Sequence, residues 1–226
     1  MKLMDWLANH KIEVHDLKLL QTAFVHSSYV HESGEDVLDN ERLEFIGDAI
    51  LQKWSAEFLF HQPQNLSEGD MTLIRSHLVS QKALHSFGLK LGLNQFLKLG
   101  TGEEKSGGRT RPSIVADMFE AFLGALYLDS GDHSVNKILM MVVPEAYKQL
   151  DLEDLMDYKT KLQEYVQADF RKTVTYEIVD VTGPDNQPEF DAIVKMDGLI
   201  LGKGSGRSKK KAEQAAARSA LEKMVK

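Results

Sequence analysis

The 226-residue sequence contains no cysteine. A disulfide-stabilised scaffold, a thiolate metal site and a cysteine nucleophile are therefore excluded. It also has no uncharged apolar run of about 18 residues or more, the length that a membrane-spanning helix needs. The first twenty residues mix charged and apolar positions and do not read as a signal peptide. We therefore expect a cytoplasmic protein with no membrane partner.

Basic residues are scarce in the first two thirds of the chain. Residues 1–157 carry 14 basic and 24 acidic residues, a net charge of −10, whereas residues 158–226 carry 13 and 10, a net charge of +3. This asymmetry predicts two modules with different tasks, although chance variation on solvated surfaces would produce the same split.

Strand patterns are absent from the first 150 residues, where apolar positions recur at helical spacing. The longest loop is expected at 101–113, with Ser113 capping the apolar helix that follows. We therefore predict an all-α N-terminal domain.

The pattern changes near residue 158. A short amphipathic helix precedes alternating, β-branched segments, and Asp197-Gly198 is a strong hairpin signal between two of them. Ser208 is expected to cap an alanine-rich final helix. The predicted order is α-β-β-β-α, with the helices at 158–169 and from 208 and the strands at 173–181, 189–196 and 199–204. The predicted fold class is thus multidomain: an all-α domain over 1–152, a linker over 153–157 and a small α+β domain over 158–226.

Acidic side chains interrupt two otherwise apolar helical segments. In the first, Glu41, Glu44 and Asp48 form one stripe. In the second, Asp117 and Glu120 are three residues apart and therefore share a face. Buried carboxylates are costly unless they are paired or bound to metal.

The two acidic helices are therefore predicted to face each other and share a divalent cation. Oxygen ligands without cysteine favour Mg²⁺ or Mn²⁺ over zinc, and such sites commonly act on phosphate esters. The alternative is a solvated face or an internal salt bridge. His26 is expected to be a structural hydrogen-bonding residue rather than a base.

Three consecutive lysines occupy the first turn of the predicted C-terminal helix, Lys209, Lys210 and Lys211. The positive end of the helix dipole disfavours cations there, so the arrangement favours an anionic partner at the helix N-terminus. A polynucleotide backbone suits three lysines better than one small anion does. A solvated basic patch balanced by Glu213 is the alternative.

Three stretches of the chain resemble the ribonuclease III family in its bacterial form, one nuclease domain followed by one domain that binds double-stranded RNA. They are LDNERLEFIGDAIL at 38–51, the block from LGTGEEKSGG to LYLDSG at 99–131, and the tail from 158 to 226 with GRSKKKAEQAAA. The resemblance implies a homodimer that uses Mg²⁺, or Mn²⁺ as a substitute, and no small-molecule cofactor. It implies cleavage of both RNA strands to 5′-phosphate and 3′-hydroxyl ends with short 3′ overhangs, in precursor ribosomal RNA and structured messenger RNA.

The resemblance also implies roles for single residues. The implied catalytic carboxylates are Glu44, Asp48, Asp117 and Glu120, of which Glu44, Asp117 and Glu120 hold metal, with Glu41 and Glu68 as secondary acidic residues. Phe45 matches a dimer-contact position, with an ordinary core residue as the alternative. The implied RNA-binding residues are Lys209 and Lys210 at phosphates, Gln163 and Glu164 at a minor groove, and Asn186, where many relatives carry histidine.

Two other functions are compatible with parts of this pattern. A catalytically inactive regulator that binds double-stranded RNA would keep the fold, but such degenerate nuclease domains usually lose a metal ligand. A metal-dependent phosphohydrolase acting on nucleotides would explain the carboxylates and leave the basic C-terminal module without a task. The predicted function is therefore the Mg²⁺-dependent endoribonuclease.

Overall fold

The computed structural model describes residues 2–63, 66–150, 155, 157–184 and 186–224. The chain folds as two compact units, Met1–Leu150 and Asp151–Lys226. The linker expected at 153–157 falls mostly on residues outside the described ranges. None of the helices in those ranges is long and apolar enough to cross a membrane.

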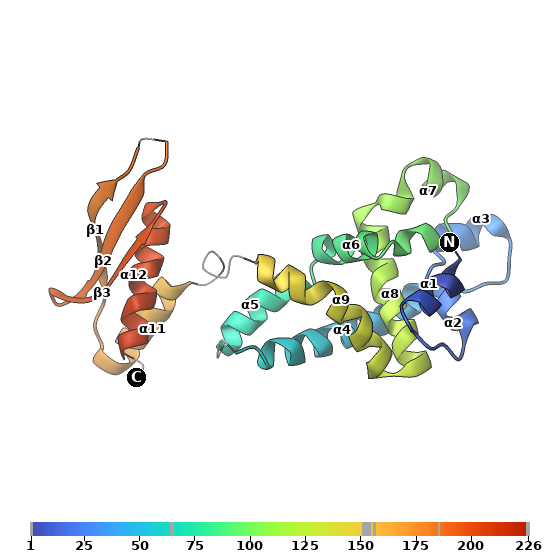
Figure 1. Cartoon of the computed structure of the whole chain (residues 1–226), viewed down its shortest axis with the longest axis horizontal. Helices are drawn as coiled ribbons and strands as arrows, with labels where there is room; N and C mark the ends of the chain where they lie inside the picture. The colour runs from blue at the N-terminus through green and yellow to red at the C-terminus, as the bar shows by residue number, and fades with distance from the viewer. Residues whose placement is uncertain (1, 64–65, 151–154, 156, 185, 225–226) are drawn as a thin grey trace. The chain divides into compact units, whose positions relative to one another are not determined.

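The first unit is built from helices (Figure 1). Its described elements are α1 (Leu3–Asn9), α2 (Leu17–Thr22), α3 (Ser27–Ser33), α4 (Glu41–Phe60), α5 (Glu68–Leu78), α6 (Gln81–Lys90), η1 (Leu93–Phe96), α7 (Thr101–Lys105), η2 (Gly108–Thr110), α8 (Pro112–Ser130) and α9 (Asp132–Gln149). Among these residues the β-type pairing is a single bridge between Val25 and Lys98. The all-α prediction is confirmed.

Helix α8 is the centre of this unit. It packs against α4, α6 and α9 (Figure 1), and its residues from Ile114 to Leu126 are buried apart from Asp117 and Glu120, which are partly exposed. A helix that is apolar almost all round is expected to be enclosed in this way. The side chains of these two acidic residues are therefore partly accessible to solvent on an otherwise buried helix.

Two local predictions before α8 are wrong. The segment 101–113 is not a plain loop, because it contains α7 and η2. The Arg109 guanidinium holds it together by donating to Glu104 Oε1 at 2.9 Å and to the carbonyl of Asn94 at 3.0 Å. Ser113 does not cap α8. The helix begins one residue earlier at Pro112, whose fixed φ suits the first helical position.

The second unit has the predicted α-β-β-β-α order, so this part of the fold class is also confirmed. Its elements are α11 (Tyr158–Phe170), β1 (Thr175–Thr182), β2 (Glu189–Met196), β3 (Leu199–Gly206) and α12 (Lys209–Met224). The sheet is antiparallel in the order β1-β2-β3, and Ala192 of β2 pairs with Ile178 of β1 and Gly204 of β3. Asp197 and Gly198, both with positive φ, make the turn between β2 and β3, as the hairpin signal predicts.

Small residues allow α12 to lie directly on the sheet. A Cβ atom on Gly202 would be 2.3 Å from the carbonyl oxygen of Ala216, and one on Gly204 would be 2.2 Å from the Ala216 amide nitrogen. The alanines of α12 form the core with Leu162 and Val166 of α11 and with Ala192 and Val194 of β2. The alanine-rich composition of this helix therefore follows from close packing.

Candidate active site and nucleic-acid interface

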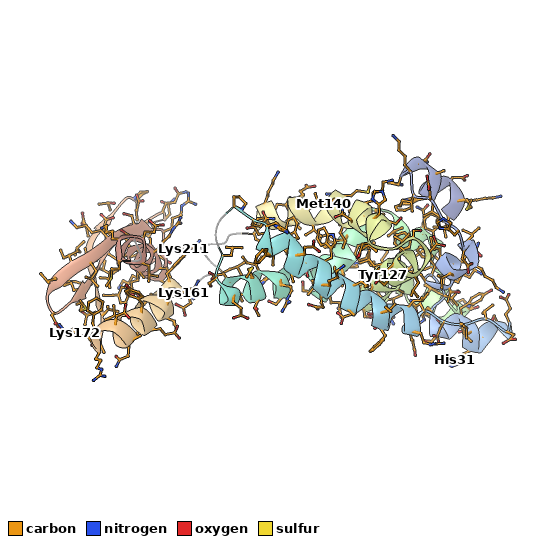
Figure 2. All side chains as sticks on the ribbon, turned by 90° about the horizontal axis from the view of Figure 1, so that it is seen from below. His31, Tyr127, Met140, Lys161, Lys172 and Lys211 are labelled. Atoms are coloured by element: carbon orange, nitrogen blue, oxygen red, sulfur yellow. The ribbon has the colours of Figure 1, made fainter. Side chains whose placement is uncertain are left out.

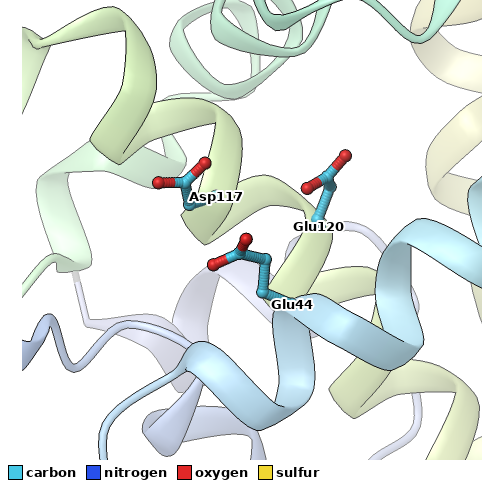
Figure 3. Close-up of side chains that lie close together, drawn as sticks. All are labelled: Glu44, Asp117 and Glu120. Atoms are coloured by element: carbon cyan, nitrogen blue, oxygen red, sulfur yellow. The ribbon is translucent and has the colours of Figure 1, made fainter.

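Three carboxylates from two helices meet in the first unit. Glu44 comes from α4, and Asp117 and Glu120 come from α8 (Figure 3). One oxygen of each lies within 4.8 Å of an oxygen of the other two, and all three side chains are partly buried. The structure thus brings together the three residues for which the sequence predicts metal ligation.

Two glycines set the distance between the helices that carry these carboxylates. A Cβ atom on Gly47 of α4 would lie 1.9 Å from the Glu120 carbonyl oxygen, and one on Gly124 of α8 would lie 2.2 Å from the Leu43 carbonyl oxygen. The two backbones therefore touch at a point where no side chain fits. Because Gly47 follows Glu44 by one helical turn and Gly124 follows Glu120 by one, this contact lies directly beside the carboxylates.

Burial disfavours the ionised forms of all three groups, and repulsion by neighbouring carboxylates adds to this effect at Glu120 and Glu44. Burial is the main cause that raises the pKa of Glu120 to about 8, and the charges of Asp48, Glu44 and Asp117 add to the effect. Burial also raises the pKa of Glu44 and that of Asp117, although His26 acts in the opposite direction on Asp117. In the described part of the chain no lysine or arginine pairs with any of the three.

The donor set fits a hard divalent cation. Carboxylate oxygens without sulfur or lysine are the ligands that Mg²⁺ and Mn²⁺ prefer. A cation would favour the ionised forms that burial and repulsion disfavour, since no lysine or arginine of the described residues supplies a counter-charge. The residues present therefore fit the metal that the sequence predicts.

The raised pKa values predict how pH affects the metal-free protein. The folded state holds protons on these carboxyls up to about pH 8 for Glu120, whereas the unfolded chain releases them near pH 4. The free energy of unfolding should therefore fall as pH rises through this window. A divalent cation should restore most stability at the alkaline end. Thermal unfolding at several pH values with and without Mg²⁺ tests this, and Glu120→Gln should flatten the profile; an unchanged profile in the variant would contradict the prediction.

Three other predicted acidic residues lie outside the tight cluster. Asp48 and Glu41 of α4 are exposed, but their charges still raise the pKa of Glu44. The Asp48 carboxylate accepts a hydrogen bond from Gln52 at 3.3 Å. Glu68 is the exposed first residue of α5 and accepts a hydrogen bond from Thr72 Oγ1 at 3.2 Å. Asp48 and Glu41 therefore influence the cluster through their own charges, whereas Glu68 lies outside the cluster.

Phe45 projects from α4 into solvent. Its exposed fraction is 82%, so the alternative of an ordinary core residue is wrong. An exposed phenylalanine beside the acidic cluster is free to contact another chain.

The N-terminus of α12 presents exposed basic residues in the second unit. Lys209 and Lys210 are its first two residues, and neither forms an ion pair within the described ranges. Glu213, the expected balancing charge, instead pairs with Lys159 at 2.6 Å. Figure 2 labels further lysines on other parts of this unit, Lys161 on α11 and Lys172 before β1. Basic residues are therefore present in other parts of this unit as well as at the N-terminus of α12.

The other predicted RNA-binding residues differ in their exposure to solvent and in their hydrogen bonds within the protein. Glu164 on α11 and Asn186 in the β1–β2 loop are exposed. Gln163 is partly buried, and its amide accepts from the Val174 N–H at 3.2 Å and donates to the Lys172 carbonyl at 3.4 Å. Gln163 therefore also holds the turn that follows α11.

The sequence reasoning missed the two contact glycines. Each follows a predicted ligand by three or four residues inside an apolar helix, in EFIGDAI and EAFLGALY. A glycine in a helix interior is unfavourable unless packing requires it. That cost was the available signal that α4 and α8 touch.

Sequence comparisons identify both units. The profile of the family described as ribonuclease-III-like matches residues 16–146, and that of the double-stranded RNA binding motif matches residues 158–224.

Two similar proteins align with nearly the whole chain, and two solved nuclease-domain structures align with about two thirds of it. Ribonuclease 3 of Listeria innocua is 46% identical over 93% of this chain and 92% of its own length. Ribonuclease 3 of Bacillus velezensis is 46% identical over 96% of this chain and 88% of its own length. The crystallised nuclease domain of ribonuclease III from Campylobacter jejuni has a TM-score of 0.58 and 34% identity, over 67% of this chain and all of that domain. A second structure of that domain, with a TM-score of 0.58 and 32% identity over 64% of this chain and 97% of its own, is described as flexible in a region involved in dimer formation.

Proposed function

The chain belongs to the ribonuclease III family and is an endoribonuclease for double-stranded RNA, and on that premise we propose that it hydrolyses both strands with Mg²⁺ held by Glu44, Asp117 and Glu120. The observation that carries the proposal is the meeting of these three carboxylates within 4.8 Å of one another. Mn²⁺ is the expected substitute, since it accepts the same oxygen ligands.

The side chains of the site have distinct tasks in this reaction. Glu44, Asp117 and Glu120 would bind the cation between α4 and α8. Asp48, which is exposed beside this cluster, would add negative charge and act as a fourth catalytic carboxylate. When bound by these residues, a divalent cation would supply an activated water and stabilise charge on the phosphate. In the hydrolysis the water oxygen would bond to phosphorus as the bond between phosphorus and the 3′-oxygen breaks, and a proton would pass to that 3′-oxygen, leaving 5′-phosphate and 3′-hydroxyl ends. Glu41 and Glu68 are proposed as secondary acidic residues, and the charge of Glu41 already acts on Glu44.

The second unit would recognise the shape of the RNA double helix more than its base sequence. Lys209 and Lys210 are exposed at a helix N-terminus, an arrangement suited to phosphate. Glu164, Gln163 and Asn186 are proposed to face the wide minor groove of A-form RNA, where 2′-hydroxyls are accessible. Asparagine both donates and accepts hydrogen bonds, so Asn186 should alter affinity without abolishing binding.

Cleavage of two strands calls for two active sites. We infer a homodimer in which Phe45, 82% exposed, contacts the partner and each protomer cuts one strand, which would leave the short 3′ overhang. The dimer region described for the Campylobacter jejuni domain supports this assembly.

The proposed domains are 1–152 and 158–226 joined by 153–157. Precursor ribosomal RNA and structured messenger RNA in the cytoplasm are the proposed substrates.

A denaturing gel of a long perfect RNA duplex tests the function. The protein with Mg²⁺ should give short duplex products, the reaction should stop with a chelator, and end-labelling should show 5′-phosphates. An intact duplex that nevertheless shifts on a native gel would support the inactive RNA-binding regulator instead.

The two lysines at the start of α12 predict a measurable change in RNA binding. Replacing both Lys209 and Lys210 by alanine should weaken binding and lower the slope of log K against log salt by about 1–2, because each phosphate contact releases counterions. Filter binding at several salt concentrations measures the slope. Lys223→Ala, at the opposite end of α12, is the control, and an unchanged slope in the double variant would remove these lysines from the interface.

A further inference from the structure

Side chains join the start of α11 to α12, the helix against which it packs (Figure 1). Lys159 Nζ of α11 donates to Glu213 Oε2 of α12 at 2.6 Å, and both side chains are partly buried, with exposed fractions of 34% and 24%. Next to this pair, the Lys159 backbone N–H donates to Gln214 Oε1 at 3.1 Å. Gln214 Nε2 in turn donates to Asp157 Oδ1, also at 3.1 Å. We call these four residues the interhelix network.

Lys159 is also held against an aromatic ring. Its Nζ lies 4.5 Å from the centroid of the ring of Tyr176, a residue of β1 that packs against the core of this unit. The Tyr176 hydroxyl is buried and has no hydrogen-bond partner among the described residues, so the ring is the part of this side chain that acts on Lys159. An ammonium group over the face of a tyrosine ring is attracted to it. The Glu213 carboxylate and the ring therefore fix the ammonium group together.

The interhelix network lies one helical turn from the proposed RNA contacts on each helix. Lys159 precedes Gln163 by four residues on α11, and Glu213 follows Lys209 by four residues on α12. Residues four apart lie on the same face of a helix and are neighbours there. The network therefore joins the two helices close to the proposed minor-groove contact on one and the proposed phosphate contact on the other.

A double helix requires a particular spacing between such contacts. A domain of this kind contacts minor grooves and the intervening phosphates of A-form RNA mainly by shape. Two helices reach one duplex at the same time only if the distance between them matches the spacing of its grooves. A single strand makes no such demand, because its flexible backbone adjusts to the positions of the cationic groups.

We propose that the interhelix network positions α11 and α12 for a duplex of A-form geometry and thereby favours double-stranded over single-stranded RNA. The inference rests on the proposed function, from which it takes the RNA contacts of the two helices. Lys159 and Glu213 are positioning residues in this role, because they act through the helices and not by touching RNA. The carboxylate of Glu213 thus promotes the binding of a polyanion that its charge alone would repel.

The sign of one substitution distinguishes positioning from electrostatics alone. Glu213→Ala removes a negative charge one turn from Lys209, so charge alone predicts tighter binding of every RNA. Loss of the interhelix network instead predicts weaker binding of a duplex, with the single strand bound as tightly as by the wild type or more tightly. Glu222→Ala is the matched control, because it removes the same charge from the same helix but its partner Arg218 also lies on α12.

The experiment measures binding of a labelled RNA duplex and of one of its strands to the full chain, in EDTA so that no cation supports cleavage. We expect the Kd of Glu213→Ala for the duplex to rise about 3- to 10-fold, inside the range over which contacting residues of one network couple. Its Kd for the single strand should stay equal or fall. Glu222→Ala should bind both RNAs as tightly as the wild type or more tightly.

Two further variants keep the test independent of folding. Glu213→Gln preserves the shape of the side chain and a neutral acceptor for Lys159, so it should show a smaller loss of the same sign. Lys159→Arg keeps both the ion pair and the cation near the Tyr176 ring, and should bind both RNAs within about twofold of the wild type, below that coupling range. Urea unfolding of each variant shows which are fully folded under the binding conditions, and the comparison is made among those.

The outcomes separate this inference from the proposed function. Tighter or unchanged duplex binding by folded Glu213→Ala and Glu213→Gln would overturn the positioning role and leave the proposed lysine contacts intact. Equal loss of affinity for the duplex and the single strand would overturn it as well. A wild-type protein that binds the duplex no better than the single strand would overturn the proposed recognition of double-stranded RNA, and this inference with it.

Discussion

Replacing Glu120 by glutamine should abolish cleavage of double-stranded RNA and leave RNA binding nearly unchanged. Glu120 contributes one of the three oxygens of the cluster, and an amide is a poor ligand for a hard cation. Losing a partner of a ligand costs about 10- to 100-fold, so losing the ligand itself should cost at least about 1,000-fold in rate. The double-stranded RNA binding motif lies in the other unit, so RNA affinity should stay within about twofold, far less than the loss of a phosphate contact would cause.

The variant should remain folded, because glutamine resembles the protonated carboxyl that a pKa of about 8 favours at neutral pH. Single-turnover cleavage and native-gel binding, measured on the same preparation, test the prediction. Glu57→Gln is the matched control, since Glu57 lies on the same helix as Glu44, beside Trp54 and Phe58 and away from the cluster. Parallel loss of cutting and binding in Glu120→Gln would rule out a ligand role.

Replacing Gly47 by alanine should be the most damaging small change to the nuclease unit. The added methyl would lie 1.9 Å from the carbonyl oxygen of Glu120 and 2.5 Å from its carbonyl carbon. These are backbone atoms of a buried helix, which cannot move aside as a flexible side chain would. Overpacking of this kind costs about 3 kcal/mol or more of unfolding free energy, against a gain of about 1 kcal/mol in helix propensity.

Separation of α4 from α8 should also move Glu44 away from Asp117 and Glu120. Cleavage and Mn²⁺ affinity are therefore expected to fall together with the urea midpoint. Gly69→Ala is the matched control, because a Cβ atom there would meet only Ser67 Oγ at 4.0 Å, and it should leave the midpoint unchanged or raise it. A Gly47→Ala protein with the wild-type midpoint and full cleavage would show that the two helices do not need this contact.

Local sequence patterns predicted most of the fold. Helical spacing in the first unit and alternation near residues 175–206 were sufficient for the fold class, and the Asp197-Gly198 turn forms as predicted. The family and the enzyme class, predicted from the motifs around Glu44, Asp117 and Lys209, are confirmed by the comparisons.

Local patterns failed where hydrogen bonds and ion pairs of single side chains determine the structure. Glycines and charged residues at 101–113 indicate a loop, yet the ion pair of Arg109 with Glu104 stabilises short helices there. Gln163 resembles a free surface amide in the sequence, and only the folded chain shows it bound to the backbone of the following turn. Neither partner is predictable from spacing along the chain.

The sequence by itself determined the family, the enzyme class and the order of a helical unit before an α-β-β-β-α unit, because these follow from local periodicity and contiguous motifs. It also indicated which carboxylates were out of place in apolar helices, although their roles in metal binding stay a prediction. Only the tertiary structure decided that the carboxylate of Glu44 meets those of Asp117 and Glu120, while Asp48 is exposed outside this cluster. That distinction depends on how closely α4 and α8 approach at Gly47 and Gly124, a contact between segments more than 70 residues apart that local periodicity does not encode.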